Sequence, residues 1–213
     1  PTGSLLPVAG SAPMTAAAEH RNRLRQAMRA QRRALSPQAR MAAAEALAAN
    51  LVQLPEINAA GTVAGYWAMN GELSLHVLLA MNPGFIYCLP CLAPGHQLRF
   101  APWRVGDPLV QNRYGIPEPD LAPSSQLAPD DMDIVLLPLL AFDRHGARLG
   151  SGGGYYDRSF AFLKDRRADR SGAKQPLLIG VGYDFQEVDA LAVAPWDIPL
   201  DRVVTDARTL DCR

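Results

Sequence analysis

The chain has 213 residues, of which 48% are hydrophobic, and this size and composition suit one α/β domain or at most two small ones. Basic and acidic residues both number 21, so the net charge is zero, which argues against wholesale electrostatic binding to nucleic acid or membranes. No apolar run is long enough to span a bilayer, and three cysteines do not make a disulfide framework. We therefore expect a cytoplasmic monomer without nucleic-acid or membrane partners.

Residues 1–13 are rich in Gly, Ser and Pro, and they lack the charged start and continuous apolar stretch of a signal peptide. This composition predicts a disordered leader or a remnant of expression, with Met14 as the natural start. Residues 14–213 would then form a single α/β domain.

Two helices are predicted at the beginning of that domain. Helix-forming residues without Gly or Pro extend from Thr15 to about Leu35. Ser36 and Pro37 supply an N-cap and a first-turn proline for a second helix, which is rich in Ala and Leu and ends near Leu54.

Short strands follow these helices. Residues 62–67 predict a strand, and Ser74 can cap a short helix that ends at Met81. Residues 84–90 and 97–103 predict two more strands.

The second half of the chain alternates strands with helical sequence. Residues 106–129 predict a long ordered loop, and the apolar run at 133–143 is typical of a strand buried on both faces. A helix is predicted at 155–169, and strands at 176–184 and 201–206 complete the pattern. This alternation predicts an α/β fold with a single open, mainly parallel sheet flanked by helices.

The segment RLGSGGGYYDR, residues 148–158, places four glycines within five residues directly after the buried strand. A buried strand, a glycine loop and a helix start can together hold phosphate through backbone N–H groups and the helix dipole. The alternative is a flexible surface turn. The segment contains no lysine for a Walker loop, and its glycine spacing does not match the dinucleotide fingerprint.

Charged residues flank this glycine stretch. Arg148 could contact phosphate oxygens through two N–H groups. Asp157 either complements the dipole of the predicted helix or, beside a polyphosphate, holds Mg²⁺. The residues alone leave both interpretations of Asp157 open.

Cys88 and Cys91 have the spacing of a redox pair. They follow a predicted strand rather than opening a helix, and no nearby His or second Cys pair supports zinc binding. We interpret them as packing residues.

The segment LLPLLAFDRHGARLGSGGGYYDR, residues 136–158, closely resembles the signature of the 5-formyltetrahydrofolate cyclo-ligases, also called 5,10-methenyltetrahydrofolate synthetases. The resemblance extends over nearly all of the chain after the leader and implies a single open α/β sheet flanked by helices. The other matching segments are the basic helix at 21–40, YWAMNGELSL at 66–75, YGIPEP at 114–119, GVGYDFQ at 180–186 and PWDIPLDRVVTD at 195–206.

The resemblance implies an ATP site. Without it, Arg21, Arg25 and Arg29 would be a solvated stripe on one helix face. Family members commonly have lysine at the position of Arg21, and often Arg, Lys or Tyr at the position of Ser151 or lysine at that of Gly153, so this chain departs from the family pattern at these three positions. Arg25 and Arg148 are the implied catalytic residues. The implied ATP contacts are Arg21, Arg25, Arg148, Leu149, Gly150, Ser151, Gly152, Gly153, Gly154, Tyr155 and Tyr156.

It also implies a folate site and a magnesium site. Trp67 would offer an aromatic face to the folate, and Glu72 would accept hydrogen bonds from the pterin. In isolation these would be a core tryptophan and a helix-start carboxylate. Asp157 and Asp197 match the two magnesium carboxylates, although Asp197 alone would pass as a turn residue. The implied folate contacts within the glycine stretch are Ser151, Gly152, Gly153, Gly154 and Tyr155.

The implied reaction is the ATP- and Mg²⁺-dependent cyclisation of 5-formyltetrahydrofolate to 5,10-methenyltetrahydrofolate, with release of ADP and phosphate. One alternative is a non-catalytic nucleotide- or RNA-binding regulator on the same fold, and the intact Glu72 and Asp157 argue against it. A second is an enzyme that uses a sugar phosphate or CoA, which would not need both Trp67 and a carboxylate pair.

Overall fold

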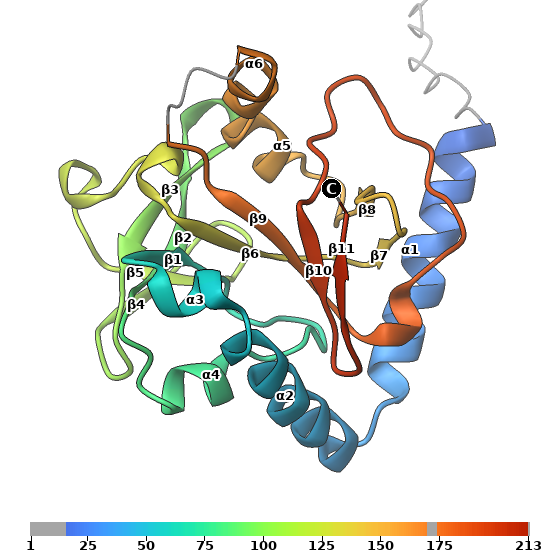
Figure 1. The fold of residues 1–213 in the computed structure, drawn as a ribbon, viewed down its shortest axis with the longest axis horizontal. Coiled ribbons are helices and arrows are strands. Elements are labelled where there is room, and N and C mark those ends of the chain that lie inside the picture. Colours follow the sequence, from blue (N-terminus) through green and yellow to red (C-terminus); the bar gives the residue numbers. More distant parts are fainter. Residues whose placement is uncertain (1–15, 170–173, 213) are drawn as a thin grey trace, which may run out of the picture.

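A computed structural model describes residues 16–169 and 174–212, and the predicted leader at 1–13 lies outside these ranges. The central element is one mixed sheet (Figure 1). Its seven strands lie in the order β11 (Thr209–Asp211), β10 (Arg202–Val204), β9 (Leu177–Val181), β6 (Ile134–Pro138), β1 (Thr62–Ala64), β2 (Ile86–Ala93) and β3 (Gln97–Pro102). All neighbours pair in parallel except β3 and β11, which form antiparallel edges. The predicted open, mainly parallel sheet is confirmed.

Helices flank this sheet (Figure 1). Ser36 Oγ accepts the N–H of Ala39 at 3.1 Å, which confirms the predicted N-cap. The single helix predicted at 155–169 is instead two helices, and among the described residues no helix is both long and apolar enough to cross a bilayer. The helices are α1 (Ala16–Ala34), α2 (Pro37–Val52), α3 (Pro55–Ala59), α4 (His76–Ala80), α5 (Tyr155–Ser159) and α6 (Phe162–Asp169).

The loop predicted at 106–129 contains regular structure. An antiparallel ribbon joins β4 (Leu109–Gln111) to β5 (Pro117–Pro119), and Asn112 closes its tip by accepting the N–H groups of Tyr114 and Ile116. Short-range turn chemistry at Asn112 therefore organises a segment whose composition indicates only a loop.

The apolar run at 133–143 is not one continuous strand. The strand β6 ends at Pro138, which has no N–H to donate to a sheet ladder. The chain then enters a second antiparallel ribbon, in which β7 (Ala141–Phe142) pairs with β8 (Arg148–Leu149). The glycine stretch follows β8, so it continues from this second ribbon and not from a strand of the main sheet.

The core confirms that the run is buried on both faces. Ile134 and Leu136 pack into the hydrophobic cluster that contains α2, α3 and α4, whereas Val135 and Leu137 pack into the cluster of Phe160 and the α6 residue Leu163. Alternate residues of a strand point to opposite faces, so β6 joins the two layers of helices. The side chains of α1 make a smaller third cluster with the β7–β8 ribbon.

The strand order creates a position suited to ligand binding. After β1 the chain first adds β2 on one side and later β6 on the other side. In open α/β sheets, ligands bind outside the carboxyl ends of strands at such a switch in strand order. The fold therefore directs attention to the residues that follow β1 and β6.

Gly146 offers a test of how tightly the β7–β8 turn is packed. Its φ is 82°, and a Cβ there would lie 2.6 Å from the carbonyl oxygen of Leu200. We expect Gly146→Ala to lower the free energy of unfolding in urea by about 3 kcal/mol, because left-handed strain and backbone overlap add.

Gly115 is the matched control, since its φ is 71° and no atom lies within 4 Å of its Cβ position. Gly115→Ala should cost only about 1 kcal/mol. Equal losses in the two variants would contradict the packing argument.

Candidate active site

A cavity of about 950 Å³ opens where the strand order switches. Tyr66 and Trp67, which follow β1, and Pro138, which ends β6, contribute to its wall. Single ligand sites usually occupy roughly 300–1,000 Å³, so this cavity lies near the top of that range. It has room for two molecules of moderate size.

The glycine stretch forms one wall of the cavity. Residues 150–154 connect β8 to α5, with φ of 108° at Gly152 and 65° at Gly154. Within the described ranges, the backbone N–H groups of residues 151–154 donate no hydrogen bond to protein atoms. Exposed, unpaired N–H groups of this kind can bind an anion.

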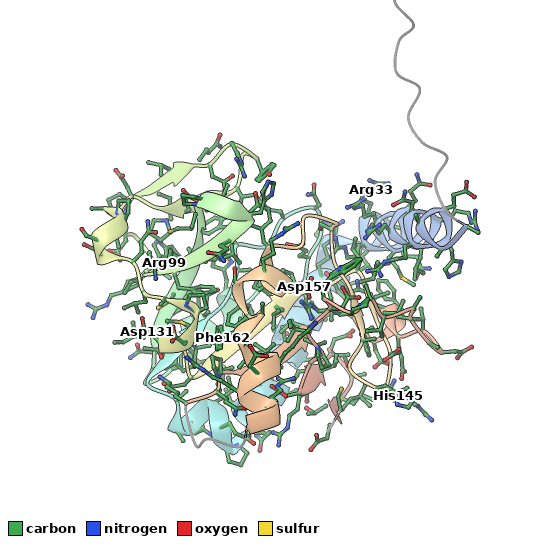
Figure 2. All side chains as sticks on the ribbon, turned by 90° about the horizontal axis from the view of Figure 1, so that it is seen from above. Arg33, Arg99, Asp131, His145, Asp157 and Phe162 are labelled. Atoms are coloured by element: carbon green, nitrogen blue, oxygen red, sulfur yellow. The ribbon has the colours of Figure 1, made fainter. Side chains whose placement is uncertain are left out.

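Arg148 and Asp157 form an ion pair of 2.5 Å at the base of this loop, and their side chains are only 8% and 22% exposed. Arg148 also donates to the carbonyl oxygen of Ile198, and Asp157 accepts the N–H of Ile198 at 3.1 Å. In Figure 2, Asp157 lies toward the middle of the molecule, with α1 to its right. The guanidinium of Arg148 is therefore engaged by protein groups.

A second arginine–aspartate pair lies in the same cavity. Arg21 Nη1 is 3.7 Å from Asp197 Oδ2 and donates to the carbonyl oxygen of Ala192 at 3.2 Å. Both predicted metal carboxylates thus have an arginine neighbour, and both line the cavity.

Arg25 contacts the beginning of the glycine loop, residues 150–154. Its Nε donates to the carbonyl oxygen of Gly150 at 2.9 Å, and its Nη1 donates to Asn22. Burial, followed by repulsion from Arg21 and Arg29, lowers the pKa of Arg25. No carboxylate of the described residues forms an ion pair with it, so an anion in the cavity would relieve this repulsion.

Aromatic rings form another part of the cavity wall. The ring of Trp67 makes edge contacts with His76 at 5.3 Å and with Trp103 at 5.7 Å between ring centroids. These contacts fix the ring while leaving it at the cavity surface, where it can pack on a flat heterocycle.

Glu72 lies beside this wall, and its carboxylate accepts the N–H of Met69 at 3.0 Å. Burial raises the pKa of Glu72, and the Met69 hydrogen bond and the charges of Arg32 and Arg29 oppose that rise. The group is a partly desolvated acceptor that faces the cavity.

The β4–β5 ribbon contacts the glycine stretch. The hydroxyl oxygens of Tyr114 and Tyr155 are 2.9 Å apart, and Arg113 donates to Tyr155 at 2.5 Å. The hydrogen bond from Tyr114, and then that from Arg113, lower the pKa of Tyr155. The ribbon tip is thereby joined to the loop that would bind phosphate.

Comparison with known proteins identifies the family. Residues 17–206 match the model of the 5-formyltetrahydrofolate cyclo-ligase family. A 5-formyltetrahydrofolate cyclo-ligase of Escherichia coli K12 is 35% identical over 85% of this chain and 97% of its own length, and one of Haemophilus influenzae is 34% identical over 74% and 82%. The chain belongs to the 5-formyltetrahydrofolate cyclo-ligase family. It is therefore an enzyme of the ligase class, as its sequence implies.

A solved structure supports the same assignment. The NMR structure of Aquifex aeolicus 5,10-methenyltetrahydrofolate synthetase superposes with a TM-score of 0.75 at 31% identity, covering 91% of this chain and 93% of that one. Family membership and fold thus agree over nearly the same residues.

The cavity of this cyclo-ligase family member brings together nearly all of the site residues predicted from the sequence. Leu149 is the exception, because its side chain is buried with Met28 and Leu140. The predicted residues that line the cavity are Arg21, Arg25, Trp67, Glu72, Arg148, Gly150, Ser151, Gly152, Gly153, Gly154, Tyr155, Tyr156, Asp157 and Asp197.

Sequence reasoning did not single out several other residues that line the cavity, among them Tyr114, Arg158, Lys164 and Trp196. Arg158 lies four residues after Gly154, a helical spacing that could have placed it near the loop. Tyr114 begins the matching YGIPEP segment. The exposed Trp196 lies in the matching PWDIPLDRVVTD segment, next to Asp197, whereas Lys164 carried no comparable signal.

The carboxylates can be tested for a fit to Mg²⁺. Among the described residues, no group of three or more His, Cys, Asp or Glu side chains is placed to hold a metal. Mg²⁺ usually binds one or two carboxylates and completes its coordination with phosphate and water. Asp157 and Asp197 fit an ion of that kind better than a permanently bound metal.

The environment of Glu72 predicts a pH-dependent stability. The pKa of Glu72 in the folded protein lies above its usual value of 4.5, so as pH rises this carboxyl ionises in the unfolded chain before it ionises in the folded protein. The free energy of unfolding of the wild type therefore falls as pH rises past that value. Glu72→Gln removes this loss while keeping an oxygen acceptor for Met69. We expect its gain in unfolding free energy to be near zero below about pH 4 and to grow with pH until Glu72 ionises in the folded state.

Urea unfolding at several pH values measures this effect. Glu45→Gln, which changes an exposed carboxylate outside the cavity, is the control and should show no comparable trend. A gain at Glu72→Gln that is the same at every pH would contradict the prediction.

Proposed function

We propose that this protein catalyses the ATP- and Mg²⁺-dependent closure of 5-formyltetrahydrofolate to 5,10-methenyltetrahydrofolate. The observation that carries the proposal is a single cavity that joins the glycine loop and Arg25 to Trp67 and Glu72. One cavity thus combines groups suited to phosphate with an aromatic ring and a carboxylate suited to a heterocycle. The names and sequences of the relatives support the same activity.

The nucleotide half of the cavity is the glycine loop with its basic neighbours. Unpaired N–H groups of residues 151–154 can hold phosphate oxygens, and Arg25 supplies charge at the edge of the loop. Arg148 acts here by holding Asp157 and Ile198 in place. Its catalytic contribution would be positional.

The folate half of the cavity would be the part lined by Trp67 and Glu72. Trp67 presents a fixed ring for the pterin or the aminobenzoyl group, and Glu72 accepts hydrogen bonds from the polar edge of the pterin. The partial burial of Glu72 strengthens such hydrogen bonds, because few water molecules compete for it.

The proposed chemistry solves a leaving-group problem. The formyl oxygen attacks the γ-phosphorus of ATP, and the bond from that phosphorus to ADP breaks. N10 then attacks the formyl carbon and loses its proton, and phosphate departs with the former formyl oxygen. Phosphoryl transfer depends on alignment and charge neutralisation, so the cavity needs no protein nucleophile.

Asp157 and Asp197 would hold Mg²⁺ against the nucleotide phosphates. When bound, the ion would neutralise charge on those phosphates. Each carboxylate also has partners in the protein: Asp157 pairs with Arg148, and Asp197 accepts the N–H of Ala194 at 2.9 Å and lies 3.7 Å from Arg21.

A direct assay tests the proposal. Purified protein is mixed with 5-formyltetrahydrofolate and ATP, with and without Mg²⁺, and near-ultraviolet absorbance of the product is followed beside phosphate release. We expect a Mg²⁺-dependent rise with one phosphate per product. Asp197→Asn should weaken activation by Mg²⁺ by roughly tenfold to a hundredfold, whereas Asp120→Asn, outside the cavity, should not.

ATP binding without product would contradict the folate assignment and favour the non-catalytic alternative. Phosphate release without 5-formyltetrahydrofolate would point instead to a different acceptor.

A further inference from the structure

We propose that Arg158 contacts the phosphates of the bound nucleotide and forms, with Arg25, a guanidinium clamp on the two sides of the glycine loop. The inference rests on the proposed function for the identity of the nucleotide. Arg158 was not among the residues implied by the sequence.

The position of Arg158 is set by the loop itself. Its Nη1 donates to the carbonyl oxygen of Gly153 at 2.6 Å, and a Cβ on Gly154 would lie 3.0 Å from the same nitrogen. The side chain is exposed, and it lines the cavity. The guanidinium therefore rests on the loop with N–H groups left for a ligand.

Arg25 occupies the corresponding place on the other side. It donates to Gly150, and its Nη2 lies 3.7 Å from the position that a Cβ of Gly152 would take. The stretch from 150 to 154 contains only Ser151 besides glycine, so the loop has no cation of its own. The two guanidiniums supply that charge from outside.

The other cavity arginines are less available. Arg148 is paired with Asp157, and Arg21 lies beside Asp197. Neither Arg25 nor Arg158 forms an ion pair with a carboxylate of the described residues. The positive charges of Arg25 and Arg158 therefore lie beside the glycine loop and are available to a phosphate bound there.

A purely structural role makes a different prediction. If Arg158 only fixes the carbonyl of Gly153, any side chain with an N–H donor could replace it in part, whether charged or not. If it contacts phosphate, positive charge is what matters. Lysine and glutamine at this position separate the two roles.

The experiment measures ATP binding at equilibrium and steady-state kinetics for Arg158→Ala, Arg158→Gln and Arg158→Lys. We expect Ala and Gln to weaken ATP binding roughly tenfold to a hundredfold, Lys to retain clearly more affinity, and the KM for 5-formyltetrahydrofolate to change less than about twofold. Arg99→Ala, an exposed arginine outside the cavity, is the control.

A second set of variants returns the charge from another position. In Arg158→Ala, adding Gly153→Lys should restore ATP binding, because it returns a positive charge to the loop. Gly153→Ala should not restore it. It is the matched control, because either substitution places a Cβ 2.9 Å from the Tyr155 ring. That ring is the end of a side chain that can turn.

Wild-type affinity in Arg158→Ala, or Lys no better than Gln, would overturn the proposal. Because ATP binding is read without turnover, a failure of the folate assignment would leave this result interpretable. Loss of product formation with intact, Arg158-dependent ATP binding would overturn the proposed function alone.

Discussion

The ion pair between Arg148 and Asp157 is the interaction on which the geometry of the site depends. It joins the end of β8 to α5 across the glycine loop, and Ile198 completes the network by accepting from Arg148 and donating to Asp157. The two ends of the glycine stretch and the distant segment at Ile198 are thereby held together at one cavity. A partner lost from such a partly buried pair leaves an uncompensated charge, so the arrangement is sensitive to either residue.

This pairing divides the arginines of the cavity into two groups. Arg148 and Arg21 hold carboxylates, and they orient the side chains that would share Mg²⁺ with the nucleotide. Arg25 and Arg158 touch the loop carbonyls and have no carboxylate partner among the described residues. Arg148 and Arg21 thus maintain the geometry of the site, whereas Arg25 and Arg158 are available to bind a negatively charged ligand.

Sequence patterns predicted the sheet, the burial of β6 on both faces and the local glycine motif, because these depend on neighbouring residues. They missed the end of β6 at Pro138, a residue that has no N–H for a sheet ladder, because the apolar run continues past it. They also missed the division between α5 and α6, because the helical sequence pattern continues across it. The family motif identified residues that, apart from Leu149, line the cavity. It did not reveal the hydrogen bond from Arg148 to the carbonyl oxygen of Ile198. That contact joins residues fifty positions apart, and no periodicity encodes it.

The cavity also explains how a chain of zero net charge can bind a polyanion. Its lining contains Arg21, Arg25, Arg148, Arg158 and Lys164, against Glu72, Asp157 and Asp197, so basic residues outnumber acidic ones locally. Cavity walls of low dielectric focus this excess of positive charge on a ligand inside. Because the loop at 150–154 has only the small side chain of Ser151, the positive charge comes from neighbouring elements, and the loop backbone stays open to close approach by a ligand.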